Sequence, residues 1–370
     1  MNFKTFARII ALLTMAFIPA ARAESSGGAQ QRLYAAVPGI RNYLEYGGHG
    51  VLVFDINHGH RFLRRIPAGG IGKDGKPMNV KGICACSATG RLYVSTLETL
   101  QCFDLRTDKL LWEKHYDGGC DRMSITPDGK KLFTPSLEKE FWRVIDAATG
   151  DVIIRIPHEK NAHNTIVSLD GREAYLADRG SRIVKIVDTA SNKVIRTAGP
   201  FGNFVRPFTV NGAHSLGYMN VDELLGFEIA DLRSGKILHR VTVAGFEKGT
   251  VAKHGCPSHG IGLTPDEKEI WLTDAHNKQI HIFDNTFTPP KQIKSIALRD
   301  EPGWITFSLD GRYAYPSTGE VIEVNSRKII TTLKDETHAE VQSEKLMEVD
   351  FDAAGKVLAV GDQFGLGRVR

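Results

Sequence analysis

The amino-acid sequence predicts an all-β protein: a ring of seven four-stranded antiparallel sheets. Short segments alternate apolar and polar side chains, as half-buried strands do. A residue that closes the third strand of each unit recurs in steps of 49, 42, 42, 43, 53 and 41 residues. A period of roughly 40–45 residues with four strands is the signature of a β-propeller, because one such sheet cannot bury both faces alone and stacks on its neighbours around an axis. The strand-closing residues are Asp55, Asp104, Asp146, Asp188, Asp231, Asp284 and Asn325.

Residues 170–202 contain the clearest copy of the repeat. The turn Asp170-Gly171 precedes an apolar run, and the alternating segment 183–187 leads to a second turn at 188–192. A last short strand follows at 193–197. Turns like the first recur as SATG, TPDG, SLDG, TPDE, SLDG and DAAG, at 87–90, 126–129, 168–171, 264–267, 308–311 and 352–355.

The N-terminal residues are not expected to belong to the ring. Residues 1–23 contain Lys4 and Arg8, an apolar run and the cleavage pattern Ala21-Arg22-Ala23, which together indicate a secretory signal peptide. Residues 24–31 resemble a flexible leader, and residues 32–370 form the single propeller domain. No later apolar run is long enough for a transmembrane anchor. The expected location is therefore the periplasm or the outside of the cell.

The two ends of the chain are expected to complete one blade together. The segment 32–66 has no inner strand of its own, and residues 346–351 near the C-terminus supply a candidate. A further run, 357–360, either adds a redundant strand or pairs beside Tyr34. This closure gives seven blades, with eight as the alternative. The remaining blades are expected at 80–117, 119–158, 162–202, 204–245, 257–300 and 302–335.

Charge and composition exclude some functions. The 370 residues carry a net charge of +4, and removal of a signal that holds three cations and no acids leaves +1. A nearly neutral chain with mixed charge argues against nucleic acid as the partner. The sequence contains no nucleophile elbow, no phosphate-binding P-loop and no C-x-x-C-H, so covalent haem is not expected.

Five cysteines leave at least one thiol without an intramolecular partner, although an exported chain permits one disulfide. The segment His254-x-Cys256-x-x-His259 is compact enough for a soft metal, but its spacing matches no standard site. Three insertions interrupt the repeats, at 68–79, 246–256 and 336–345, and the second contains His254 and Cys256. The first two connect an outer strand to the next inner strand, and such loops cover the usual binding face of a ring of repeats.

Alignment of the inner strands on their closing turns predicts what lines the axis. Near the start of the strands, the alignment brings a set of polar and aromatic side chains toward a common rim. Arginine suits a carboxylate or phosphate, tryptophan a ring face, and histidine proton transfer or a metal. The predicted ligand-binding residues are Arg122, His163, Asn164, Arg206, His259, Trp304 and Glu348. An apolar column of the same strands is expected to pack between blades, at Cys86, Ile125, Val167, Phe208, Leu263, Phe307 and Phe351.

Each rim residue also has a structural interpretation. An arginine or glutamate at a channel mouth can be solvated or paired, a strand histidine can be a satisfied core residue, and Trp304 can plug the channel. In the catalytic version, His163 or His259 is the general base and Arg122 with Arg206 holds the anion or the developing oxyanion. Glu348 then orients a histidine or a metal, and the candidate ligands of a divalent metal are His163, His259 and Glu348.

The repeat resembles that of the YVTN-type, YncE-like seven-bladed propellers. The resemblance rests on residues 170–197 and on the segments 126–133, 144–153 and 264–284, and it extends over about 32–361. It implies the fold and an exported protein. It does not carry catalytic residues with it, because propellers host binding modules and enzymes alike.

A second resemblance is to propeller lactonases of the 6-phosphogluconolactonase type. Residues 162–165, 257–260 and 302–305 are similar to the Pro-His entrance of their inner strands, with Ser258 in place of proline and Gly303 in place of histidine. The resulting hypotheses are a monomeric binding protein for a small polar or anionic ligand or a protein partner, and alternatively a hydrolase or isomerase of lactonase type in the central channel.

Overall fold

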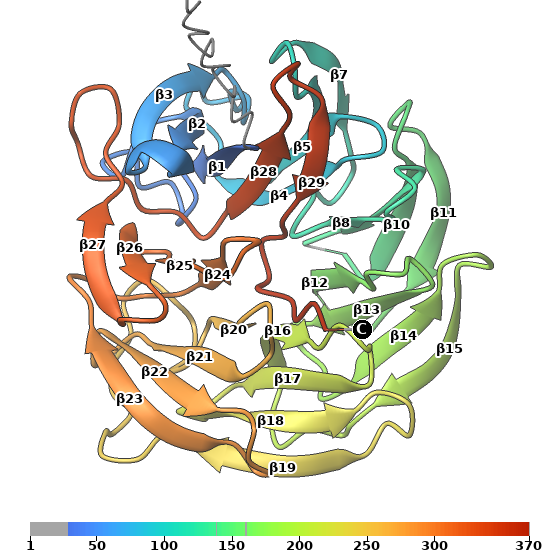
Figure 1. Ribbon diagram of the computed structural model, residues 1–370. Coiled ribbons are helices and arrows are strands. Elements are labelled where there is room, and N and C mark those ends of the chain that lie inside the picture. Colours follow the sequence, from blue (N-terminus) through green and yellow to red (C-terminus); the bar gives the residue numbers. More distant parts are fainter. Residues whose placement is uncertain (1–28, 138, 160, 370) are drawn as a thin grey trace, which may run out of the picture.

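The computed structural model describes residues 29–137, 139–159 and 161–369 and has the predicted architecture. Seven antiparallel sheets stand around one axis, and Figure 1 shows the ring along that axis. The predicted signal peptide and most of the predicted leader lie outside the described residues. Strand β1 begins at Gln30, inside the expected leader, where Gln30 pairs with Phe351. No described helix is long or apolar enough to cross a membrane.

Blade one is closed by both ends of the described chain. Strand β28 (Leu346–Phe351) pairs with β1 (Gln30–Val37), which confirms the expected closure. The run at 357–360 forms β29 (Val357–Val360), which pairs with β28 on the axial side and not with Tyr34. The sheet order is β29-β28-β1-β2-β3, with β2 at Gly50–Asp55 and β3 at Arg61–Ile66; a 3-10 turn, η1 (Ile56–His58), joins these two strands.

Blades two to four have four strands each, numbered outward from the axis. Blade two contains β4 (Val80–Cys86), β5 (Arg91–Thr96), β6 (Thr99–Asp104) and β7 (Leu110–His115). Blade three contains β8 (Ser124–Ile125), β9 (Lys131–Pro135), β10 (Phe141–Asp146) and β11 (Val152–Pro157). Blade four contains β12 (Ala162–Val167), β13 (Glu173–Asp178), β14 (Val184–Asp188) and β15 (Lys193–Ala198).

Blades five to seven repeat this order. Blade five contains β16 (Val205–Val210), β17 (Leu216–Val221), β18 (Gly226–Asp231) and β19 (Ile237–Thr242). Blade six contains β20 (Ile261–Leu263), β21 (Glu269–Asp274), β22 (Gln279–Asp284) and β23 (Lys291–Ala297). Blade seven contains β24 (Ile305–Phe307), β25 (Tyr313–Pro316), β26 (Glu320–Glu323) and β27 (Lys328–Thr332).

The recurring aspartates end the third strands because their carboxylates fold the next turn. Asp104 accepts hydrogen bonds from the backbone N–H groups of Arg106 and Thr107 at 3.0 and 2.8 Å. Asp231 does the same for Arg233 and Ser234, at 2.8 and 2.9 Å. A side chain that satisfies two N–H groups stops the ladder and sets the turn. The periodic signal in the sequence is therefore a turn signal.

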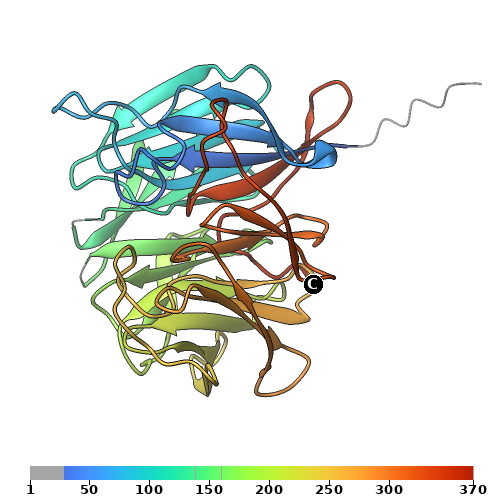
Figure 2. The ribbon, with the colours of Figure 1, turned by 90° about the vertical axis from the view of Figure 1, so that its left-hand side faces the viewer.

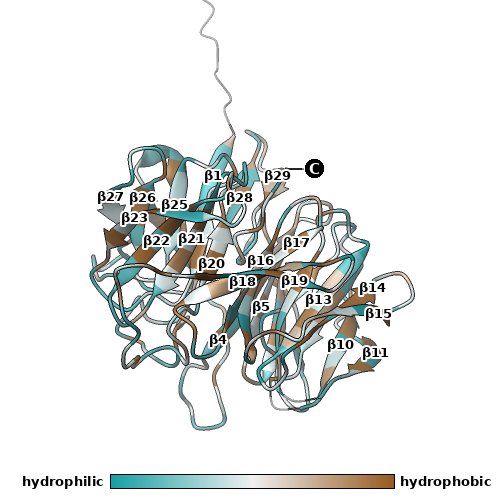
Figure 3. Cartoon of the chain, turned by 90° about the horizontal axis from the view of Figure 1, so that it is seen from below, coloured by the Kyte–Doolittle hydropathy of each residue, from teal (hydrophilic) through white to brown (hydrophobic). Residues whose placement is uncertain are grey.

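The core lies between neighbouring sheets. Six of the seven residues of the predicted apolar column are buried, and only Ile125, on the short strand β8, is partly exposed. Hydropathy colouring shows brown concentrated in the strands and teal in the connecting loops (Figure 3). The largest apolar cluster joins blades four and five to Trp304, Phe364 and Leu366 at the axis. The packing of the blades thus continues into the centre of the ring.

Candidate functional site

The central channel is blocked on one side by residues 361–369, here called the C-terminal tail. In Figure 1 the red tail crosses the middle of the ring, and in Figure 2 its end lies on the right-hand face. Gln363 accepts a hydrogen bond from the backbone N–H of Ile83 at 3.3 Å and donates to the carbonyl of Met123 at 3.3 Å. Its own carbonyl accepts from the indole N–H of Trp304. The tail therefore turns a through-channel into a pocket with one mouth.

A cavity of about 290 Å³ opens at the other side of the axis, where outer strands lead into the next inner strands. All three sequence insertions contribute to it, as expected for the binding face. We call it the basic cavity, because seven of its lining residues are lysine or arginine and only one is acidic. The lining consists of Ile40, Arg41, Asn79, Lys81, Arg122, His163, Arg179, Arg206, Lys253, His254, Gly255, His259, Glu344 and Lys345.

Four of the seven rim residues predicted from the sequence meet in this cavity: Arg122, His163, Arg206 and His259. Trp304 lies beneath them, buried, with the Arg122 guanidinium 4.5 Å from its ring centroid and Phe364 on the tail side at 6.0 Å. It lies below the lining residues and, together with the tail, closes the channel, which is the plug interpretation of this residue. Asn164 is buried but is not among the lining residues.

The structure places Glu348 away from the cavity. Its carboxylate accepts hydrogen bonds from the backbone N–H of Leu309 at 2.8 Å and from the Gln31 amide at 3.1 Å, on the side of the tight turns. Strand β29 lies on the axial side of β28, where the backbone N–H of Gly361 bonds the carbonyl of Glu348 at 2.8 Å. The structure therefore does not bring Glu348 together with His163 and His259.

The position of Glu348 leads to a prediction about pH. Burial, together with the neighbouring Asp350 carboxyl, raises the pKa of Glu348 from 4.5 to about 9. Between these two values the folded protein binds a proton that the unfolded chain releases, so stability falls as pH rises through this window. The neutral Glu348→Gln variant escapes this loss. We expect it to be more stable than the parent by at least about 1 kcal/mol at pH 8 in urea unfolding, and by less at pH 5. A difference that does not change with pH would contradict the assignment.

His163 is held by a buried carboxylate on the neighbouring inner strand. Its Nδ1 donates to Asp121 Oδ2, and its Nε2 accepts from Arg122 Nη1 at 3.3 Å. Burial, together with the nearby charges of Arg122 and Lys81, lowers the pKa of His163 to about 3, although Asp121 opposes this shift. The imidazole is therefore neutral at pH 7, with a fixed tautomer whose Nε2 lone pair faces Arg122.

Glu344 is the cavity residue that the sequence did not point to. It is buried, and its Oε2 accepts from Arg122 Nη2 at 2.5 Å and from Lys345 Nζ at 2.8 Å. Its Oε1 lies 2.9 Å from Nδ1 of His254. Glu344 belongs to the insertion 336–345, where no repeat alignment assigns a direction to a side chain. The only available signal was an acidic residue at the end of a loop on the binding face.

The remaining cations of the cavity divide into paired and unpaired groups. Arg206 lies 3.0 Å from Asp222, Lys253 contacts Asp300, and Lys345 contacts Glu344. Lys81 and Arg179 have no carboxylate in ion-pair contact among the residues that the structure describes. Burial lowers the pKa of Lys81, and the charges of Arg122 and Arg179 lower it further. Within the described part of the chain, two positive side chains thus face the cavity without an ion-pair partner.

The cysteines form no disulfide. Cys84, Cys86, Cys102, Cys120 and Cys256 are all free thiols, so the disulfide that the sequence permits is absent. Cys256 does not join the two histidines that flank it in sequence, because its Sγ lies 3.2 Å from the carbonyl of Ser258. Burial raises the pKa of its thiol to about 11.

Gly303, which replaces the histidine of the lactonase pattern, is explained by packing. A Cβ atom at this position would overlap the imidazole ring of His254. The departure from that pattern therefore makes room for a histidine from the loop 246–256. The histidine near the axis at this position is therefore His254 from the loop, whereas residue 303 itself is glycine.

Comparisons with known proteins agree on the fold. A scan of protein-family models finds no match, and neither does a search of curated protein sequences. The structure is similar to a chain of hydrazine synthase from Kuenenia stuttgartiensis, with a TM-score of 0.57 and 15% sequence identity over 76% of this chain and 86% of that chain. At this identity the likeness reaches no further than the fold. The chain is a seven-bladed β-propeller, and its function has to be inferred from the cavity.

Proposed function

We propose that this protein binds a small anion, of the carboxylate or phosphate class, in the basic cavity. The observation that carries the proposal is the pair of unmatched cations, Lys81 and Arg179, inside a pocket with one mouth. Lys81 is partly buried and Arg179 is exposed, so both charges remain available to a ligand that offers negative charge and hydrogen-bond acceptors. An anionic ligand supplies both the negative charge and the acceptor atoms, whereas a neutral ligand supplies no charge.

The balance of charge around the cavity supports the same ligand class. Seven lysine and arginine side chains line it, against one lining carboxylate and three that stand behind the lining: Asp121, Asp222 and Asp300. Arg41, at the mouth, bonds the backbone carbonyls of Lys253 at 3.2 Å and Ala252 at 3.5 Å, and has no ion pair among the described residues. A concave site with excess charge of one sign concentrates ligands of the opposite sign. The volume limits the ligand to a small molecule.

The test is anion binding by calorimetry at pH 7.5 and constant ionic strength, with phosphate, sulfate, and mono- and dicarboxylates. The double variant Lys81→Gln/Arg179→Gln should bind at least about tenfold more weakly, since a hydrogen bond to a charged group contributes roughly 1.5–3 kcal/mol. It should unfold no more easily than the parent, because neither cation has a carboxylate partner to lose.

The matched control is Lys130→Gln/Arg172→Gln. It removes the same charge from two side chains that are 79% and 85% exposed, in the tight turns on the opposite face. This control should leave binding unchanged. The proposal fails if no anion of the panel binds, or if both double variants weaken binding equally.

A second candidate, hydrolysis of a small anionic lactone or ester, is favoured by the Asp121–His163 pair. A carboxylate that fixes the tautomer of a histidine is the arrangement of a general base. The pKa of about 3 makes His163 a weak base in the free protein, so we rank binding first. Turnover of a lactone or ester that carries a carboxylate or phosphate, abolished by His163→Gln while anion binding persists, would reverse this order.

We also propose that the protein acts in the periplasm or outside the cell. Support comes from the signal-like residues 1–23 and from the resemblance of the repeats to exported YncE-like propellers. Cell fractionation with a cytoplasmic marker tests the location. Retention of the full-length chain in the cytoplasm would contradict it.

A further inference from the structure

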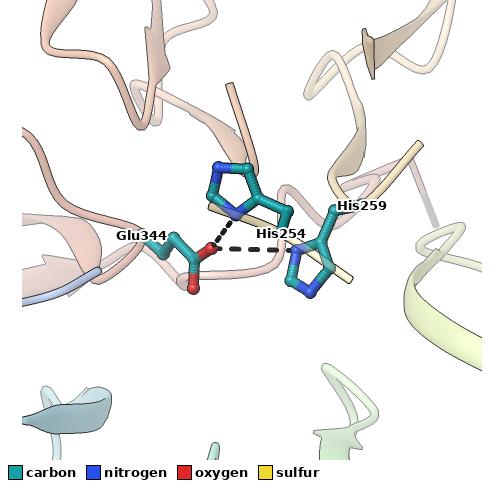
Figure 4. Close-up of side chains that lie close together, drawn as sticks. All are labelled: His254, His259 and Glu344. Atoms are coloured by element: carbon teal, nitrogen blue, oxygen red, sulfur yellow. Dashed lines mark ion pairs between the residues drawn. The ribbon is translucent and has the colours of Figure 1, made fainter. Parts of the chain in front are cut away.

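We propose that His254, His259 and Glu344 form a binding site for one divalent transition-metal ion of the zinc class. Each residue offers one ligand atom, and these three atoms lie within 4.8 Å of one another. Figure 4 shows both imidazoles turned toward the Glu344 carboxylate, with Oε1 at 2.9 Å from His254 Nδ1 and at 3.8 Å from His259 Nδ1. All three side chains are buried, so the cluster is not a set of solvated surface groups.

The hydrogen bonds of His254 point to a cation between it and Glu344. Its Nε2 lies 3.2 Å from the carbonyl oxygen of Glu301, and its Nδ1 lies 2.9 Å from Glu344 Oε1. Both oxygens are acceptors, but a neutral imidazole has only one N–H to donate. One contact therefore needs a second proton or a metal ion. A metal at Nδ1 leaves Nε2–H bonded to the backbone carbonyl, which is how metal-bound histidines are commonly oriented.

Outer contacts also hold His259 and Glu344. His259 Nδ1, the nitrogen that faces Glu344, lies 2.8 Å from the carbonyl of Gly303, so an ion bound through Nδ1 replaces this hydrogen bond, and an ion bound through Nε2 requires the ring to turn. Glu344 Oε2 is fixed by Arg122 at 2.5 Å and Lys345 at 2.8 Å, so Oε1 remains for the ion. Outer partners that fix the direction of each ligand atom lower the entropy lost when a metal binds.

Two imidazoles and one carboxylate select the class of metal. Zinc, cobalt and iron(II) accept such nitrogen and oxygen donors, whereas magnesium and calcium prefer oxygen alone. Three protein ligands leave one position of a tetrahedral zinc ion open, and all three line the basic cavity.

Repulsion from the positive charges of Arg122 and Lys345 opposes the binding of a metal ion at this site. This repulsion gives a further expectation that rests on the proposed function: a bound anion offsets it, so anion and metal should strengthen each other's binding.

The test uses the purified protein after dialysis against a chelator, and titration with cobalt(II) and zinc(II). We expect one equivalent of metal per chain, a visible cobalt spectrum, and binding at least about tenfold weaker in His259→Gln and in His254→Gln. The controls are His163→Gln, which changes the other cavity histidine, and Glu348→Gln, which changes the carboxylate that the sequence suggested. Both controls should bind metal as the parent does.

Two outcomes would overturn the metal site: no metal bound at micromolar concentrations, or equal loss of binding in His163→Gln and His259→Gln. If the ligand variants fail to fold, the X-ray absorption spectrum of the zinc-loaded parent decides, because it must show imidazole ligands. The proposals can fail separately. If the protein binds metal but no anion, the proposed function is wrong and the metal site stands. If it binds an anion but no metal, the metal site is wrong and the proposed function stands.

Discussion

Replacing Phe364 with alanine should lower the free energy of unfolding by about 3–5 kcal/mol, the range for large-to-small changes of a buried aromatic ring. Phe364 is 3% exposed and packs in the channel with Trp304 and Leu366. Its removal leaves a void in the tail, where neighbours held by hydrogen bonds to Gln363 cannot easily collapse. Urea unfolding followed by tryptophan fluorescence measures the change.

The control for this prediction is Val369→Ala in the same tail. Val369 is 49% exposed, and such surface changes usually stay within about 0.5 kcal/mol. A loss below about 1 kcal/mol in Phe364→Ala would show that the tail is not a packed part of the core. The channel, including the basic cavity, would then be open at both ends.

Replacing Arg122 with methionine should cost about 3–5 kcal/mol at pH 7.5, the range for breaking a buried ion pair by removing one partner. Arg122 contacts Glu344 at 2.5 Å, Asp121 at 3.5 Å and the ring of Trp304. The methionine keeps much of the apolar contact with the ring but no charge. Two buried carboxylates then lose one of the cations that keep them ionised.

The pH dependence distinguishes this mechanism from lost packing. Burial would raise the pKa of Asp121 and of Glu344, but nearby positive charges, Arg122 among them, hold both pKa values well below the ordinary range. Stability from such groups is present above the unfolded pKa values of about 4 and is lost as pH falls toward the folded values. The cost of Arg122→Met should therefore be smaller at pH 4 than at pH 7.5. An equal cost at both values would assign it to packing alone, and Arg172→Met, an exposed change, serves as the control.

The fold was predictable because local rules determine it. The turn-forming aspartates and the period-2 alternation both depend on residues close together in sequence. Seven copies of the same repeat therefore indicate the same four-stranded blade. The same alignment located Arg122, His163, Arg206 and His259, since an inner strand fixes which side chains approach the axis. It misplaced Glu348 because it took β28 as the lining of the channel, whereas β29 and the tail lie on its axial side.

The residues that the sequence missed belong to segments without a repeat. Glu344 lies in an insertion, as does His254, which the sequence named only within a candidate soft-metal segment, and Arg179 follows β13 in a loop. Their positions depend on contacts with other blades, for example the hydrogen bond of His254 to Glu301. A histidine pair such as His254 and His259 is visible in sequence, but its third partner, 85 positions after His259, is not.

Closure of the ring between β1 and β28 has a consequence for folding kinetics. Gln31 bonds Glu348 across 317 positions, and Ser343 bonds the carbonyl of Ala36 across 307. Contacts of such high sequence separation form late, because the entropy of closing the loop is lost before the contact is gained. Blades two to seven can each assemble from consecutive segments, whereas blade one must wait for residues 346–351. The basic cavity, in a channel closed by residues 361–369, should accordingly be the last part of the molecule to acquire its native shape.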